Sequence, residues 1–143
     1  MKNYAKIINE EWNKPVREAQ LRNGVEYPVE INQVPKVINR FAAQRIYSLL
    51  HEEIEELFNA ITRVNSDEGK IVEIADAIGD IMYLALGLAG QMGLQDKIEG
   101  ILDEIHSSNQ TKLIDGKITF NDIGKVMKPE GYRKPDLHKV IFK

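Results

Sequence analysis

The sequence predicts an all-α fold, in the form of a small four-helix bundle followed by an irregular, basic C-terminal tail. Apolar residues recur with helical spacing over four stretches, turn formers separate these stretches, and strand signals are weak. The chain has 143 residues, of which 43% are hydrophobic and 29% are charged. This length and composition suit one globular domain. We therefore expect a single domain over residues 1–143, with a helical core at about 35–112 and a tail at 113–143.

Each predicted helix has its own boundary signals. The four stretches lie at about 3–20, 35–65, 67–92 and 95–109. Pro15 is expected to kink or split the first helix, because it lacks an N–H and its ring clashes with the preceding turn. The sequence Asn65-Ser66-Asp67 ends the second helix and caps the third. In the tail, Asp115-Gly116-Lys117 and Pro129-Glu130-Gly131 predict turns. Short connections between the helices favour a bundle.

Composition excludes several classes of protein. The chain has no cysteine, which excludes disulfides and thiolate metal sites. No apolar run reaches the roughly 18 residues of a membrane span, and the N-terminal residues do not form the apolar stretch of a signal peptide. We expect a cytoplasmic protein with no membrane partner. Trp12, the single tryptophan, is expected to anchor the first helix in the core rather than to stack on a base.

Charge is distributed unevenly along the chain. Residues 51–105 carry thirteen acids against three bases, whereas residues 106–143 carry eight bases against four acids. A nucleic-acid surface needs a continuous basic face, so no nucleic-acid partner is expected. An acidic middle followed by a basic tail suits a site where acids hold a metal and bases contact phosphates.

The second predicted helix carries carboxylates on its apolar face. On a helical wheel of about 100° per residue, Glu53 lies in the middle of the apolar stripe. That stripe consists of Ile46, Leu49, Leu50, Leu57, Ala60 and Val64. Glu56 lies at the edge of the stripe, Glu52 lies just outside it, and Glu55 points away. Carboxylates thus stand where leucines would be expected.

The third predicted helix is apolar nearly all round, except for Glu73, Asp76 and Asp80 on a single face. Burying unpaired carboxylates on two facing helices costs several kcal/mol each. The middle of the chain has few bases, so a metal ion is the best source of the missing positive charge. All-oxygen ligands favour Mg²⁺, with Mn²⁺ as a substitute, over Zn²⁺.

Two other interpretations compete with this one. The acids could decorate exposed faces of amphipathic helices, with no ligand role. A carboxylate-bridged di-iron site is the second alternative, but it normally needs a Glu-x-x-His pair. His51 directly precedes Glu52 and lies on the far side of the wheel from Glu53, so it does not supply that pair.

The acidic pattern resembles a known superfamily. Glu52-Glu53-x-x-Glu56, followed by Glu73-x-x-Asp76 with Asp80, is similar to the ExxE and ExxD motifs of the all-α NTP pyrophosphatase superfamily. This superfamily includes MazG-like enzymes, dimeric dUTPases and phosphoribosyl-ATP pyrophosphohydrolases. The resemblance covers about residues 40–137. The segments that resemble the MazG-like, phosphoribosyl-ATP-pyrophosphohydrolase-like branch are Asn109-Gln110-Thr111-Lys112 and Lys128-Pro129-Glu130-Gly131-Tyr132.

The resemblance implies a fold, a reaction and roles for particular residues. It implies a MazG-like bundle that hydrolyses a (deoxy)nucleoside triphosphate to the monophosphate and pyrophosphate. Phosphoribosyl-ATP hydrolysis in histidine biosynthesis is one alternative, and a non-catalytic oligomeric helical module is another. One to three Mg²⁺ ions would be held by Glu53, Glu56, Glu73, Asp76 and Asp80. Either Glu73 and Asp76 or Asp76 and Asp80 form the main second pair, because all three share one face.

The resemblance also implies the remaining site residues. Glu52 would be the base that orients the attacking water. Asn109 and Lys112 would contact substrate phosphate or sugar, although Lys112 could instead complement the helix dipole. Lys128 and Tyr132 would close the site from the tail. Subunits of such enzymes pair, so we expect a homodimer or a homotetramer.

Overall fold

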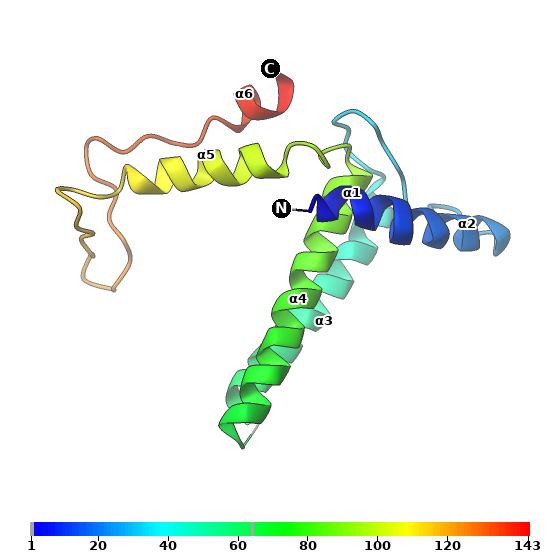
Figure 1. The fold of residues 1–143 in the computed structure, drawn as a ribbon, viewed down its shortest axis with the longest axis horizontal. Coiled ribbons are helices and arrows are strands. Elements are labelled where there is room, and N and C mark those ends of the chain that lie inside the picture. The colour runs from blue at the N-terminus through cyan, green and yellow to red at the C-terminus, as the bar shows by residue number, and fades with distance from the viewer. Residues whose placement is uncertain (1, 64) are drawn as a thin grey trace. The chain divides into compact units, whose positions relative to one another are not determined.

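The computed structural model describes residues 2–63 and 65–143 (Figure 1). Val64, which we assigned to the apolar stripe, lies outside the described residues. In the described part of the chain the regular elements are helices, accompanied by isolated β-bridges, so the predicted all-α fold class is confirmed. The chain divides into two compact units, Met1–Asp96 and Lys97–Lys143. None of the helices described is long and apolar enough to cross a membrane.

The first predicted helix is split near Pro15. Its three parts are α1 (Tyr4–Ile8), the π-helix η1 (Asn9–Asn13) and α2 (Lys14–Arg22). Pro15 lies in the first turn of α2, where a missing N–H costs little. In the turn before it, the Lys14 N–H donates to the carbonyl of Asn9. This acceptor is five residues earlier, which is the spacing of a π-helix. The wider turn is how this helix accommodates the proline.

The largest feature of the first unit is a helical hairpin. Helices α3 (Arg40–Arg63) and α4 (Asp67–Gln91) lie side by side and run in opposite directions (Figure 1). The Ser66 side-chain oxygen accepts the Gly69 N–H at 3.1 Å, which confirms the predicted N-cap of α4. Helix α3 begins at Arg40 instead of near residue 35. The Lys36 N–H donates to the Met92 carbonyl at 2.9 Å, so this segment is bonded to the end of α4 and not into a helix.

The N-terminal helices pack against the C-terminal part of α4, where α4 has small residues. The Asn13 side-chain amide donates to the Gly87 carbonyl at 2.9 Å. A Cβ at Gly90 would lie 2.9 Å from the Asn9 side chain, and a Cβ at Gly93 would lie 2.1 Å from the Val34 carbonyl oxygen. Gly93 also has a φ of +73°. Glycine is therefore required here, both for the turn that ends α4 and for the close approach of the preceding loop.

The hairpin leaves much apolar surface uncovered in a single chain. The large apolar side chains that α3 and α4 expose are Tyr47, Leu49, Ile54, Phe58, Ile61, Ile71, Val72, Ile78, Met82 and Tyr83. Helix α4, which the sequence shows to be apolar nearly all round, is thus only partly covered within one chain. Trp12, expected in the core, is 55% exposed and meets Tyr83 edge to face at a centroid distance of 6.3 Å. That expectation was wrong: the buried residues of η1 are Asn9 and Asn13, whereas Trp12 contacts α4 at the exposed Tyr83.

The second unit consists of α5 (Ile98–Gln110), the tail and a short α6 (Leu137–Phe142). The Asp115-Gly116 turn is present: Ile114 and Lys117 form a β-bridge, and both central residues have positive φ, as in a type I′ turn. Helix α6 was not predicted. It begins where the Asp136 side chain accepts the Lys139 N–H at 3.1 Å.

Candidate active site

Glu53 is the centre of a carboxylate cluster on the α3–α4 hairpin. Its side chain is half-buried, and its Oε2 atom is fully buried without a hydrogen-bond partner. The pKa of Glu53 is raised above its usual value of 4.5, first by burial and then by the negative charges of Glu56, Asp80 and Asp76. Glu56 is on α3, whereas the two aspartates are on α4. The hairpin therefore brings the two acidic motifs of the sequence together.

Among the described residues, no Lys, Arg or His forms an ion pair with this cluster. In residues 2–63 and 65–143 the ion pair present is between Arg133 and Glu104, and neither belongs to the cluster. An ionised carboxylate is a pure acceptor, so Glu53 can hydrogen-bond to Glu56 only if one of them is protonated. A buried acceptor without a donor is costly. A bound cation would attract the carboxylate oxygens of all four side chains in the cluster at the same time.

The donor set fits a hard divalent cation. Carboxylate oxygens from two helices are the ligands that Mg²⁺ and Mn²⁺ prefer. In the described part of the chain, however, no three His, Cys, Asp or Glu side chains are already arranged as a coordination sphere. Like charges at close range repel, which opposes a tighter approach of these side chains. The cluster thus has a donor set that suits a hard divalent cation, and Glu53 contributes a fully buried oxygen to it.

The other predicted acids lie around this cluster. Glu52 is exposed on α3 beside Glu53, and Glu73 is exposed one turn before Asp76 on α4. Neither of them contributes to the pKa shift of Glu53. Asp80 is half-buried, while Glu56 and Asp76 are exposed. The structure thus groups Glu53 with Glu56, Asp76 and Asp80, and it leaves Glu52 and Glu73 at the periphery.

The four predicted substrate-binding residues lie together in the second unit. At the end of α5, the Lys112 ammonium donates to Asn109 Oδ1 at 2.9 Å. The same ammonium lies 5.8 Å from the centroid of the Tyr132 ring, and the Lys128 ammonium lies 5.1 Å from it. Both distances are within the range of cation–π attraction. Lys112 and Lys128 thus bring two ammonium groups close to one aromatic ring.

Contacts that the sequence did not reveal attach the tail to α5. The Arg133 guanidinium pairs with Glu104 and also donates to Ser107 Oγ at 2.9 Å. The buried Ser108 hydroxyl donates to the Arg133 carbonyl at 2.7 Å. The pKa of Glu104 is lowered, first by the Asp136 N–H and then by Arg133. These partners are 25 to 32 residues apart in the sequence, so no local pattern indicates them.

Comparison with known families covers the carboxylate helices. The family model of phosphoribosyl-ATP pyrophosphohydrolase matches residues 29–109, which is more than half of the chain. The match includes all six predicted acids and Asn109, whereas Lys112, Lys128 and Tyr132 lie beyond it. No curated protein matches the chain. On the extent of this match, the chain belongs to the phosphoribosyl-ATP pyrophosphohydrolase family, within the MazG-like all-α NTP pyrophosphatase superfamily.

Proposed function

We propose that this protein is a Mg²⁺-dependent nucleoside triphosphate pyrophosphohydrolase, which converts a (deoxy)nucleoside triphosphate and water into the monophosphate and pyrophosphate. The observation that carries the proposal is the buried, unpartnered Oε2 of Glu53, which faces the charges of Glu56, Asp76 and Asp80. Membership of a pyrophosphohydrolase family supports the reaction class.

In this proposal the carboxylates hold the metal. Glu53, Glu56, Asp76 and Asp80 are the main ligands, and Glu73 is a further ligand at the edge. When bound, Mg²⁺, or Mn²⁺ in its place, would neutralise phosphate charge and lower the pKa of a bound water. Glu53 has the role of the fixed ligand, because the burial of its side chain restricts its rotamers more than those of its exposed neighbours.

Glu52 is proposed as the base. Its side chain is exposed beside Glu53, so water can reach its carboxylate and transfer a proton to it. The water oxygen would bond to the α-phosphorus while the bond from that phosphorus to the bridging oxygen breaks. The proton would pass to Glu52, and pyrophosphate would leave with the electron pair of the broken bond. Asn109, Lys112, Lys128 and Tyr132 are proposed to bind the phosphate or sugar of the substrate.

Phosphoribosyl-ATP is the second candidate substrate, and the name of the matching family favours it. The same bond between α- and β-phosphate would be broken, so the roles of the carboxylates would be unchanged. The two candidate substrates differ only in the part of the molecule beyond the triphosphate, which is bulkier in phosphoribosyl-ATP.

We also propose that the protein works as a homodimer or a homotetramer in the cytoplasm, without a nucleic-acid or membrane partner. The exposed apolar side chains of α3 and α4 support self-association. A monomer rarely exposes so many large apolar side chains on two adjacent helices. Pairing of two such hairpins would produce a four-helix bundle, with the carboxylate clusters inside it.

The test is a product analysis. The protein is incubated with Mg²⁺ and either a panel of nucleoside triphosphates or phosphoribosyl-ATP, and the products are separated by ion-exchange chromatography. Monophosphate and pyrophosphate are expected, and both should be absent with EDTA and strongly reduced in Glu53→Gln and Glu52→Gln. Glu55→Gln, the same change on an exposed part of α3, is the matched control. Diphosphate and orthophosphate would contradict the proposal. No turnover of any substrate would favour a non-catalytic module.

A further inference from the structure

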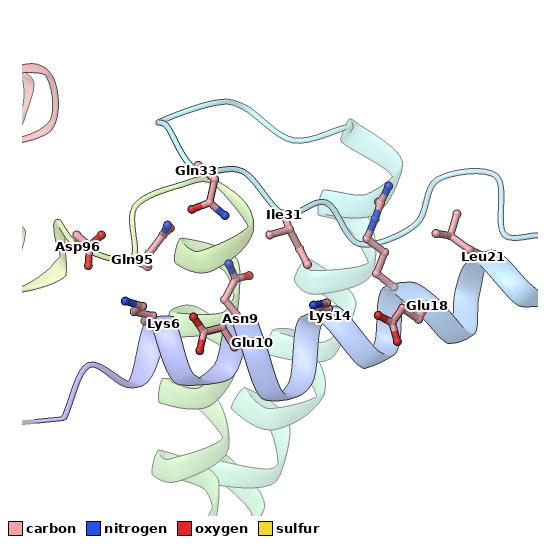
Figure 2. A pocket seen from close by; sticks show the side chains of 11 residues that line it. Lys6, Asn9, Glu10, Lys14, Glu18, Leu21, Ile31, Gln33, Gln95 and Asp96 are labelled. Carbon is pink, nitrogen blue, oxygen red and sulfur yellow. The ribbon is translucent and has the colours of Figure 1, made fainter.

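A pocket of about 460 Å³ lies in the first unit, between the N-terminal helices and the segments that flank the C-terminal end of α4. Figure 2 shows side chains from α1, η1 and α2 on one side, and side chains from the loop before α3 and from the segment after α4 on the other. A volume of this size is within the range that holds small organic ligands. None of the carboxylates of the cluster around Glu53 lines it.

Two buried amides line this pocket without a full set of partners. Gln95 is only 8% exposed, and its Oε1 atom is buried without a hydrogen-bond donor. Asn9 is 5% exposed; its oxygen accepts from Asn13, but in the described part of the chain its side-chain nitrogen has no acceptor. In Figure 2 the Asn9 amide points from the helix toward the two segments that carry Gln33 and Gln95. The Asn9 nitrogen is thus a donor for a ligand, and a half-turn of the Gln95 amide, which exchanges its two ends, makes the Gln95 oxygen available as an acceptor.

The rim of the pocket carries charges of both signs. Its cations are Lys6, Lys14 and Arg17, and its acids are Glu10, Glu18 and Asp96. Arg17 already donates to the Val29 carbonyl at 2.6 Å, and Asp96 accepts from the Asn3 amide at 3.2 Å. Among the described residues, neither Lys6 nor Lys14 forms an ion pair. These two ammonium groups remain available to an anion, and the glutamates remain available to hydroxyl or amine donors.

Two aliphatic side chains, Leu21 and Ile31, complete the lining. A ligand that matches all these groups has an anionic group, hydroxyl donors, and a flat apolar body whose edge carries both a donor and an acceptor. A nucleoside monophosphate has each of these parts: a phosphate, a ribose and a base. We propose that this pocket is a metal-independent binding site for a nucleoside monophosphate. The phosphate lies against Lys6 and Lys14, and the base edge lies against Asn9 and Gln95.

The pocket is separate from the carboxylate cluster. Gln91, at the end of α4, is eleven residues beyond Asp80, which corresponds to about 16 Å along a straight helix. Gln95 lies beyond that end. The site therefore does not depend on the proposed catalytic activity, and its ligand does not need a divalent cation.

The experiment is a calorimetric titration of the full chain with AMP. EDTA is present, so that a site that needs a divalent cation binds no ligand. Saturable binding is expected, at least tenfold tighter than that of adenosine or of inorganic phosphate. Lys14→Gln, at an exposed position, is expected to weaken binding about tenfold, because a charge-assisted hydrogen bond is lost. Lys36→Gln is the matched control, because this exposed lysine is outside the pocket. Gln95→Met removes the amide at similar volume and should weaken binding as well.

A second measurement locates the ligand. In a nitrogen–proton correlation spectrum, AMP should shift the side-chain amide signals of Asn9 and Gln95 in the presence of EDTA. Binding that requires Mg²⁺, binding of phosphate alone with equal affinity, or equal losses in Lys14→Gln and Lys36→Gln would each overturn the proposal. Since none of these readouts needs turnover, an inactive protein with intact AMP binding would contradict only the proposed function.

Discussion

Asp80 on α4 raises the pKa of Glu53 on α3, so the two helices of the hairpin hold carboxylates close enough to repel one another. This repulsion adds to the burial of Glu53, which is the larger cause of the shift. A fold that tolerates such an arrangement gains little from it in stability, since the same positions with apolar residues would pack without charge. The pair therefore supports the proposed metal site, and the consequences of this proposal can be measured in several ways.

The raised pKa of Glu53 predicts a specific pH dependence of stability. Between its usual value of 4.5 and its higher value in the fold, the folded state binds more protons than the unfolded state. The contribution of Glu53 to the free energy of unfolding therefore falls as pH rises through this window. In EDTA at neutral pH, Glu53→Gln should melt at a higher temperature than the wild type, and the difference should shrink toward pH 4.

Mg²⁺ should stabilise the wild type against heat and should have much less effect on Glu53→Gln. Glu55→Gln is the control for the loss of one charge from α3, and it should behave like the wild type in both conditions. A Glu53→Gln protein that is less stable than the wild type in EDTA at neutral pH would show that burial does not penalise this carboxylate.

The grouping of Asp80 with Glu53 also ranks the ligands on α4. Asp80→Asn should reduce Mn²⁺ affinity at least tenfold, because Asp80 is half-buried and acts on Glu53 directly. Glu73→Gln should have a smaller effect, because Glu73 is exposed and does not perturb Glu53. Electron paramagnetic resonance of free Mn²⁺ measures both affinities. The reverse order would place the main pair at Glu73 and Asp76.

The tail predicts an effect on substrate binding. Lys128→Gln removes one of the two ammonium groups that lie against Tyr132, and we expect KM to rise roughly tenfold with a smaller change in kcat. Lys125→Gln makes the same change at an exposed tail position, outside the cluster, and should leave KM unchanged. Steady-state kinetics on the preferred triphosphate distinguish the two variants. Equal effects would mean that tail charge, rather than the Tyr132 cluster, governs binding.

The exposed face of the hairpin predicts self-association. Phe58 is 59% exposed in a single chain, so Phe58→Asp should shift the protein from an oligomer to a monomer in size-exclusion chromatography with light scattering. Val37, which is 82% exposed in the loop before α3, provides the control Val37→Asp, which should remain oligomeric. A wild-type protein that is monomeric at all concentrations would contradict the proposed assembly.

Much of this arrangement is predictable from local patterns. The boundaries of α4 and its Ser66 cap follow from turn and capping residues, and the position of Glu53 in the apolar stripe follows from helical periodicity. The turn at Asp115 and Gly116 follows from the preference of that dipeptide for positive φ. These features depend on residues close in sequence, for which backbone geometry fixes which side chains share a face.

Features that depend on distant partners were not predictable in the same way. The late start of α3 results from a backbone hydrogen bond between Lys36 and Met92, which no local pattern specifies. Trp12 is exposed because a π-turn changes the register of the first helix just before Pro15. The choice between Glu73 and Asp80 could not be made from a helical wheel, because the position of α3 alongside α4 determines which of them faces Glu53.

Hydrolysis in water enriched in the heavy oxygen isotope tests the central claim most directly. The products of the Mg²⁺-dependent reaction are separated and their masses are measured. If the carboxylates around Glu53 direct water to the α-phosphorus, the heavy oxygen will be in the nucleoside monophosphate, the pyrophosphate will carry none, and Glu53→Gln will incorporate little. Heavy oxygen in pyrophosphate or orthophosphate would mean attack at another phosphorus and would contradict the proposed cleavage.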